Sequence, residues 1–310
     1  MTFPHLIENS YGFTDAFAAI RWASANVETV KTALAAEGAV LFRGFPIQTA
    51  ADFDGFSAAF GYGDFTYKES LSNAVRINRT ARVFTANEAP PDVEIFLHHE
   101  LAQTPIYPQK IFFCCLSPAE KGGATPVCRS DDLFLAFSTR HPVWADRFRQ
   151  LGVRYTTWMP GRDDAGSGQG RSWRSTLGAS GRADAEARLA GLGYTWIWVE
   201  NDSLLATTPV LPAVRRLENG RESFFNQVIA AYRGWERRAG DSKPLLTFGN
   251  GAEIPADALD ALVETSLEFI TPLEWQQGDI ALVDNYRVMH GRYPYSGSRK
   301  REVLVCLATE

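Results

Sequence analysis

The chain has 310 residues, of which 45% are hydrophobic and 22% charged, as is usual for a soluble globular protein. Its net charge of −5 and its pI near 5.7 argue against a nucleic acid or an anionic membrane surface as a partner, since both favour a basic protein face. The first residues do not resemble a signal peptide, and no apolar run approaches the ~20 residues of a membrane span, so we expect a cytoplasmic protein.

The first third of the chain predicts two helices and a strand. Residues 27–37 have the apolar spacing of an amphipathic helix, and Gly38 is a typical helix stop. The strand AVLFRGF follows directly at 39–45, and residues 50–61 predict a second short helix ending at its glycine.

From about residue 92 the pattern becomes that of short β-strands rich in β-branched and aromatic residues. These runs are VEIFLHH (93–99), KIFFCCL (110–116), TPVC (125–128), TWIWV (195–199), SFFNQVI (223–229), DIALVD (279–284) and EVLVCLA (302–308). No repeat and no linker divides them. We therefore expect one domain over residues 1–310, mainly β with flanking helices, closed or sandwiched.

Two further segments complete the expected organisation. The Gly-rich stretch 160–172 does not follow a strand and open a helix, so it is not a phosphate loop, and we interpret it as a mobile insertion over a pocket. Residues 184–194 predict another short helix. Cys114 and Cys115 lie in an apolar run, where neighbours point to opposite faces of a strand, which indicates core cysteines and no metal or disulfide site.

The candidate metal ligands are His98, Glu100 and His290. Two imidazoles and one carboxylate can cap one face of an octahedron, as in non-haem Fe(II) oxygenases, and leave three positions open. His98 and Glu100 are two residues apart at the end of an extended run, so their side chains leave the same face and that of His99 points away. A single HxE pair is weak evidence, because most histidines only pack or form hydrogen bonds.

Two more residues strengthen this interpretation. Thr125 follows KGGA at the start of a β-run, and Arg301 begins a strand 11 residues after His290. An arginine on a strand next to the one that leads into the metal ligand can form a bidentate salt bridge with a dicarboxylate.

Several ordered segments of the chain resemble the taurine dioxygenase (TauD/TfdA) family. They are EGAVLFRGF, LHHELAQTPIYPQKIFFCCLSPAEKGGATP, FFNQ, EWQQGDIALVDNYRVMHGRYPYSG and RKREVLV. The resemblance runs from about residue 30 to 308 and is nearest to the branch of clavaminate-synthase-like and SyrP-like enzymes, in which the metal pair is HxE. It implies a double-stranded β-helix (jelly roll) core, with Fe(II), 2-oxoglutarate and O2 as cofactor and cosubstrates and succinate and CO2 as products.

The resemblance also implies roles for particular residues. His98, Glu100 and His290 would hold iron, and Thr125 and Arg301 would bind the distal carboxylate of 2-oxoglutarate. Arg299 is the alternative to Arg301, because Glu302 interrupts the usual run of arginine into an apolar strand. In the family, an acidic residue and then an arginine often follow the Gly-Gly-x-Thr-Pro motif. Here Arg129 comes before Asp131, so no role is carried over to these two residues. Glu100 occupies the position that halogenases leave open for chloride, which favours hydroxylation, desaturation or ring closure.

Candidate substrate-binding residues are Arg76, Asn87, Gln103 and Arg292; the last follows Gly291 and is expected to face either solvent or substrate. Structural roles are expected for the turn Trp275–Asp279, for Asp284 and Asn285, and for Asn226.

The sequence thus predicts an oxygenase acting on an amino acid or an amino-acid-derived metabolite, free or bound to a carrier protein. The alternative is a jelly-roll protein that binds metal without turnover. A zinc hydrolase fits less well, because it needs a dedicated general base and has no use for Arg301. Substrate identity and oligomeric state are left open.

Overall fold

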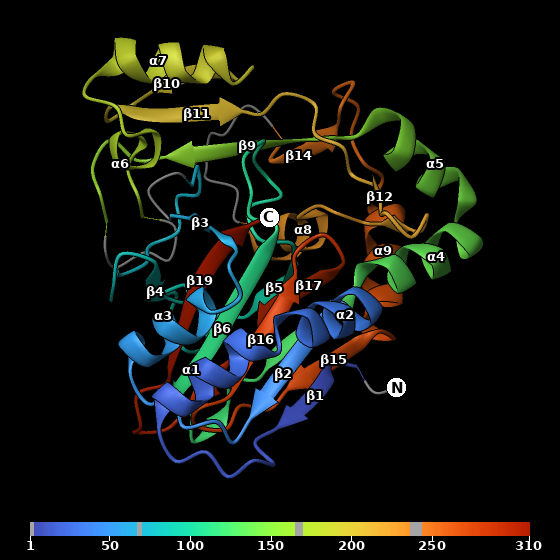
Figure 1. The fold of residues 1–310 in the computed structure, drawn as a ribbon. Helices are drawn as coiled ribbons and strands as arrows, with labels where there is room; N and C mark the ends of the chain where they lie inside the picture. Colours follow the sequence, from blue (N-terminus) through green and yellow to red (C-terminus); the bar gives the residue numbers. More distant parts are fainter. Residues whose placement is uncertain (1–2, 67–69, 165–169, 236–243) are drawn as a thin grey trace.

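Two facing β-sheets form the centre of the computed structural model, which describes residues 3–66, 70–164, 170–235 and 244–310 (Figure 1). In spatial order, the large sheet consists of β1 (His5–Glu8), β2 (Ala39–Arg43), β16 (Ile280–Asp284), β6 (Lys110–Ser117), β19 (Glu302–Thr309) and β3 (Gly63–Phe65), with β4 (Val83–Thr85) also paired to β19. The small sheet consists of β15 (Ile270–Leu273), β8 (Thr125–Arg129), β17 (Val288–Arg292) and β5 (Ile95–His98).

The remaining elements surround this pair of sheets. A third sheet contains β10 (Thr195–Val199), β11 (Ser203–Thr207), β9 (Val153–Met159) and β14 (Leu246–Phe248). Two short pairs are β12 (Arg215–Arg216) with β13 (Glu222–Ser223), and β18 (Tyr295–Ser296) with β7 (Lys121–Gly122). The helices are α1 (Ala16–Ala25), α2 (Val27–Glu37), α3 (Ala50–Ala58), α4 (Ser130–Arg140), α5 (Pro142–Leu151), α6 (Trp173–Leu177), α7 (Arg182–Gly191), α8 (Val228–Gly234) and α9 (Ala256–Leu267). None of these helices is long and apolar enough to cross a bilayer.

Alternation along the strands of the large sheet builds two hydrophobic cores. In β6, Ile111, Phe113 and Cys115 point between the two sheets, whereas Phe112 and Cys114 point to the outer face. The outer face is covered by α1, α2 and α3, which lie across the large sheet (Figure 1). Because both faces are buried, the strand is apolar throughout and not alternating in its sequence.

Helices also cover the back of the small sheet. Cys128 of β8 and Met289 of β17 point outward into a core formed with α4, α5, α8 and α9. On the inner side, Val127 and Val288 pack against the large sheet. The jelly-roll core is therefore enclosed by helices on both outer faces, and the fold predicted from the sequence is confirmed.

Most of the predicted elements are confirmed. The helix predicted at 27–37 is α2, and Gly38 ends it in the left-handed region. The helices predicted at 50–61 and 184–194 correspond to α3 and α7, each ending earlier than expected. All four cysteines are free and buried, as expected.

The strand predicted for SFFNQVI is wrong. Only Glu222–Ser223 pairs as β13, and α8 begins at Val228. The side chain of Asn226 accepts a hydrogen bond from the backbone N–H of Val228 at 2.8 Å, a local turn that starts the helix. The apolar residues of a short run do not distinguish a buried helix from a strand.

Gly38 offers a test of the packing between α2 and the small sheet. A Cβ atom there would lie 2.9 Å from Cγ2 of Val288, and the residue has φ of +86°. Gly61 has φ of +71° but no atom within 4 Å of the added Cβ, so it is a matched control for backbone strain alone. We expect Gly61→Ala to lower the free energy of unfolding by about 1–2 kcal/mol, and Gly38→Ala to lower it by about 1 kcal/mol more through overpacking. Urea denaturation measures both, and equal losses would show that Val288 simply moves aside.

Candidate active site

His98, Glu100 and His290 converge at the inner side of the small sheet. β5 and β17 are antiparallel, and His98 lies directly opposite His290 in their register. The two imidazole rings have centroids 4.4 Å apart, and one potential ligand atom from each of the three residues lies within 4.8 Å of the others. Of the residues that the structure describes, this is the group of acidic, histidine or cysteine side chains that could hold a metal ion.

Asn285 fixes the turn that presents Glu100. Its side-chain oxygen accepts a hydrogen bond from the backbone N–H of Glu100 at 2.7 Å, and its amide donates to the carbonyls of Glu100 and Pro108 at 3.0 and 2.7 Å. The ring of His99 lies on the other side, between the carbonyl of Asn285 and the hydroxyl of Ser130. The prediction that His99 points away from the ligand pair is therefore confirmed.

The surroundings of His98 and Glu100 suit a cation. Nδ1 of His98 lies 2.8 Å from the carbonyl of Phe96, which it reaches as a donor, so Nε2 keeps its lone pair. Burial lowers the pKa of His98 to about 4. Burial alone would raise the pKa of Glu100, but Arg76, His290 and His98 outweigh it and hold that pKa below its usual value. Two imidazole nitrogens and one carboxylate are a donor set that fits Fe(II).

One cavity joins these three residues to Thr125 and Arg301. The strands of the large sheet contribute an apolar part of its wall: Phe113, Val303 and Val305. The Arg301 guanidinium donates from Nε to the carbonyl of Gly123 at 3.1 Å. Burial lowers the pKa of Arg301 to about 10, so it stays charged at neutral pH. The cavity thus contains metal-ligand donors and a partly buried cation, which suits a ligand with two carboxylates.

The location of Arg301 differs in one respect from the expectation. It precedes β19 of the large sheet, whereas His290 belongs to β17 of the small sheet. The strands are not neighbours, and the two residues meet across the cavity. Arg299 is exposed, and its backbone N–H donates to Glu120 at 3.0 Å, so the structure does not bring it to the cavity. Thr125 starts β8 as predicted, and its hydroxyl accepts a hydrogen bond from Trp275 at 3.0 Å.

Arg292 does not face solvent, which corrects one of the two expectations for it. It is buried, and its guanidinium donates to the backbone carbonyls of Asn87, Ala89, Pro90 and Val93. These hydrogen bonds attach the segment 87–93 to β17, the strand that carries His290. Arg292 also lines the cavity shared with Arg301.

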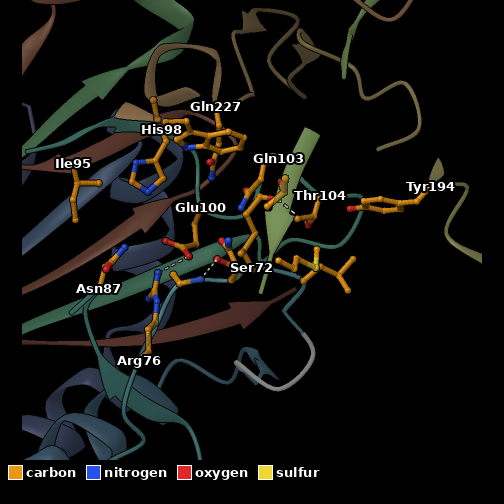
Figure 2. A pocket seen from close by; sticks show the side chains of 18 residues that line it. Ser72, Arg76, Asn87, Ile95, His98, Glu100, Gln103, Thr104, Tyr194 and Gln227 are labelled. Carbon is orange, nitrogen blue, oxygen red and sulfur yellow. Dashed lines mark hydrogen bonds and ion pairs between the residues drawn. The ribbon is translucent and has the colours of Figure 1, made fainter. Parts of the chain in front are cut away.

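A second cavity shares His98 and Glu100, and also Arg76, Asn87 and Ile95, with the first (Figure 2). Three of the predicted substrate-binding residues line it: Arg76, Asn87 and Gln103. The side-chain oxygen of Gln103 is buried without a hydrogen-bond partner. Sequence reasoning missed further polar wall residues, namely Ser72, Asn73, Thr104, Tyr194 and Gln227. They come from four separate segments, so no local pattern in the sequence marks them.

The mobile insertion predicted at 160–172 is described only at its two ends, because residues 165–169 lie outside the described residues. The end at Arg171 is joined to the wall of the second cavity. Its backbone N–H donates to the carbonyl of Asn73 at 3.0 Å, and its guanidinium donates to that of Ser72 at 2.7 Å.

The residues expected to be structural have structural contacts. Asn226 donates to the carbonyl of Ala213, and Asp284 accepts from the backbone of Tyr286. Asp279 closes the turn after Trp275 by accepting from Gln276, and it also pairs with Arg43 at 2.7 Å. Asp131, to which no role is carried over from the family, is buried among three arginines: Arg129, Arg221 and Arg287.

Comparison with known proteins decides the family. Residues 14–307 match the model of the taurine catabolism dioxygenase TauD, TfdA family, which is nearly the whole chain. The chain belongs to the TauD/TfdA family. It is an Fe(II)- and 2-oxoglutarate-dependent dioxygenase, with O2 as the other cosubstrate.

Two relatives cover most of this TauD/TfdA chain. A clavaminate synthase-like protein of Arabidopsis thaliana is 36% identical over 270 residues, 87% of this chain and 81% of that protein. The dapdiamide synthesis protein DdaC of Enterobacter agglomerans is 31% identical over 289 residues, 88% of this chain and 83% of that protein.

Solved structures of lower identity share the fold. PvcB of Pseudomonas aeruginosa has a TM-score of 0.55 at 14% identity, over 98% of this chain and 85% of its own. AAD-2, solved with Mn(II) and N-oxalylglycine, has a TM-score of 0.54 at 16% identity, over 100% of this chain and 95% of its own. At these identities the likeness shows the jelly-roll fold alone.

The ligand set gives a direct prediction. We expect His98→Ala, Glu100→Ala and His290→Ala each to abolish turnover, since each removes a donor atom, while His99→Ala retains bound iron. Metal content after anaerobic loading and gel filtration measures whether each variant keeps iron, and thermal unfolding verifies that each variant is folded. Iron lost from the His99 variant and kept in the His98 variant would transfer the ligand role to His99.

Proposed function

We propose that this dioxygenase oxidises an unactivated C–H bond of an amino acid or an amino-acid-derived metabolite, by hydroxylation, desaturation or ring closure. The printed names of the two relatives, clavaminate synthase-like and dapdiamide synthesis, support a substrate of this class. The neutral polar wall of the second cavity supports it as well, since carboxamides and hydroxyls suit a small polar molecule.

The observation that carries the proposal is the meeting of two cavities at His98 and Glu100. One contains Thr125 and Arg301, and the other contains Gln103 and further polar residues. We assign the first to 2-oxoglutarate and the second to the substrate. The substrate would then lie beside His98 and Glu100, within reach of the metal that these residues would hold.

Each residue has a separate task in this scheme. Fe(II) with 2-oxoglutarate supplies the oxidising chemistry, using O2 and releasing succinate and CO2. His98, Glu100 and His290 hold the metal, and Arg301 fixes the distal carboxylate with the help of Thr125. Phe113, Val303 and Val305 keep the wall of this cavity dry, which strengthens the contact between the guanidinium and the carboxylate.

Glu100 also restricts the type of reaction. As a third protein ligand it fills the position that a halide would need, which favours oxidation over halogenation. The metal-binding protein without turnover, which the sequence leaves as the alternative, is disfavoured by membership of the dioxygenase family and by the partly buried Arg301 in the cavity wall. Keeping a guanidinium charged in a mostly apolar wall costs desolvation energy that a bound carboxylate offsets.

Turnover against a panel of substrates tests the proposal. The protein is incubated with Fe(II), 2-oxoglutarate and air, and succinate is measured with single amino acids, their N-acyl or amide derivatives, and aminoacyl thioesters of a carrier protein. We expect succinate to rise well above the substrate-free rate with members of one of these groups. The His98→Ala variant is the control. Anaerobic Fe(II) and 2-oxoglutarate giving no visible charge-transfer band with the wild type would favour the metal-binding alternative.

The cosubstrate anchor gives a second prediction. Hydrogen bonds to charged groups contribute about 1.5–3 kcal/mol, so Arg301→Ala should weaken 2-oxoglutarate binding by roughly tenfold to a hundredfold. Lysine should restore part of the affinity, because a point charge does not reproduce the planar fork. Arg299→Ala is the matched control and should leave the dissociation constant unchanged. The opposite pattern in the two alanine variants would transfer the role to Arg299.

A further inference from the structure

Arg76 forms a buried ion pair with the candidate iron ligand Glu100. The distance from its Nη2 to Oε1 of Glu100 is 2.7 Å, and the two side chains are only 8% and 4% exposed. Figure 2 shows Arg76 reaching toward Glu100 from the wall of the second cavity. The guanidinium also lies over the ring of Phe84, 5.3 Å from its centre. Packing and charge thus fix the side chain beside the carboxylate.

The two oxygens of Glu100 are in different surroundings. Oε1 accepts the hydrogen bond from Arg76, whereas Oε2 lies 3.3 Å from Nε2 of His290. Oε2 is therefore the oxygen on the histidine side, where the ligand atoms gather. Oε1 has a partner that holds it away from them.

This asymmetry matters for coordination chemistry. Carboxylates bind metals through one oxygen or through both. Three protein donors leave three positions of an octahedron, which a bidentate cosubstrate and O2 fill completely. A glutamate that used both oxygens would occupy one of these positions. Its extra methylene, compared with aspartate, adds a rotatable bond that must be fixed by something else.

We propose that Arg76 is a positioning residue that keeps Glu100 monodentate. By holding Oε1, it leaves only Oε2 for the metal and preserves the positions needed by 2-oxoglutarate and O2. This inference rests on the proposed function, since it concerns the same metal site. It also reassigns Arg76, which the sequence suggested as a substrate-binding residue, because a substrate carboxylate would have to displace Glu100 from a buried pair.

The test compares metal binding with cosubstrate binding in Arg76→Met, which keeps an unbranched apolar side chain and removes the guanidinium donors. Mn(II) and anaerobic Fe(II) titrations measure the metal, and the charge-transfer band measures 2-oxoglutarate without any substrate. We expect metal affinity to be unchanged or higher, since a nearby cation is lost and a second oxygen becomes free. The dissociation constant of 2-oxoglutarate should rise about tenfold or more, as expected for loss of a charged hydrogen bond. A structure with Mn(II) should show both oxygens of Glu100 on the metal.

Two further variants separate positioning from folding. Arg76→Lys keeps one charged donor and should restore part of the 2-oxoglutarate affinity. In a Glu100→Asp background the shorter carboxylate is withdrawn from Arg76, so Arg76→Met should have a smaller effect there than in the wild type. Arg140 pairs with Glu268 on the surface of α4, and Arg140→Met is the control that should behave as wild type.

The outcomes are distinct. Loss of metal and cosubstrate together in a folded Arg76→Met variant would overturn the inference, as would an unchanged 2-oxoglutarate affinity combined with a higher KM for substrate. The second result would return Arg76 to substrate binding. If the wild type itself gives no charge-transfer band, the proposed function fails; if wild type and variant give the same band, only the role of Arg76 fails.

Discussion

The antiparallel pairing of β5 with β17 is the constraint on which the site depends. It puts His98 opposite His290, two residues that are 192 positions apart in the chain. Asn285 then binds the backbone on both sides of Glu100, so the turn after β5 has a fixed path. Because Asn285 itself lies just before β17, the same short segment positions all three ligands. A shift of β5 by one residue against β17 would turn His98 to the opposite face of the sheet, away from His290.

The enclosing helices allow that sheet to carry polar ligands on its inner side. The outer face of the small sheet is packed by α4, α5, α8 and α9, and that of the large sheet by α1 to α3. These two cores pack the outer faces of both sheets, in addition to the apolar core between them. The inner space can therefore be divided between an apolar core at one end and the two cavities that meet at Glu100.

The sequence predicted what depends on local patterns and missed what depends on long-range contacts. The HxE pair and the distal histidine could be recognised because strand alternation gives their direction. The strand prediction over α8 is wrong, because the turn that starts this helix is formed by a hydrogen bond to the side chain of Asn226, which the composition of the segment does not reveal. That Arg301 faces His290 from the opposite sheet follows from the closure of the jelly roll, which no spacing encodes. The contact of Arg76 with Glu100 joins residues 24 positions apart, and Arg76 lies in a stretch without regular structure, so no periodicity predicts where its side chain points.

The buried charges suggest why metal and cosubstrate belong together in this site. Arg76 and Glu100 neutralise each other, and Arg292 and the partly buried Arg301 remain as cations in the cavity wall. Fe(II) alone would add two positive charges to this low-dielectric space, and the 2-oxoglutarate dianion alone would add two negative ones. Bound together they leave the local charge unchanged. Because charges interact strongly where water is excluded, each ligand should favour binding of the other, with reciprocal coupling between the two. The arginines therefore have two effects. They bind carboxylates, and their positive charge determines which net charge of the bound metal complex the cavity favours.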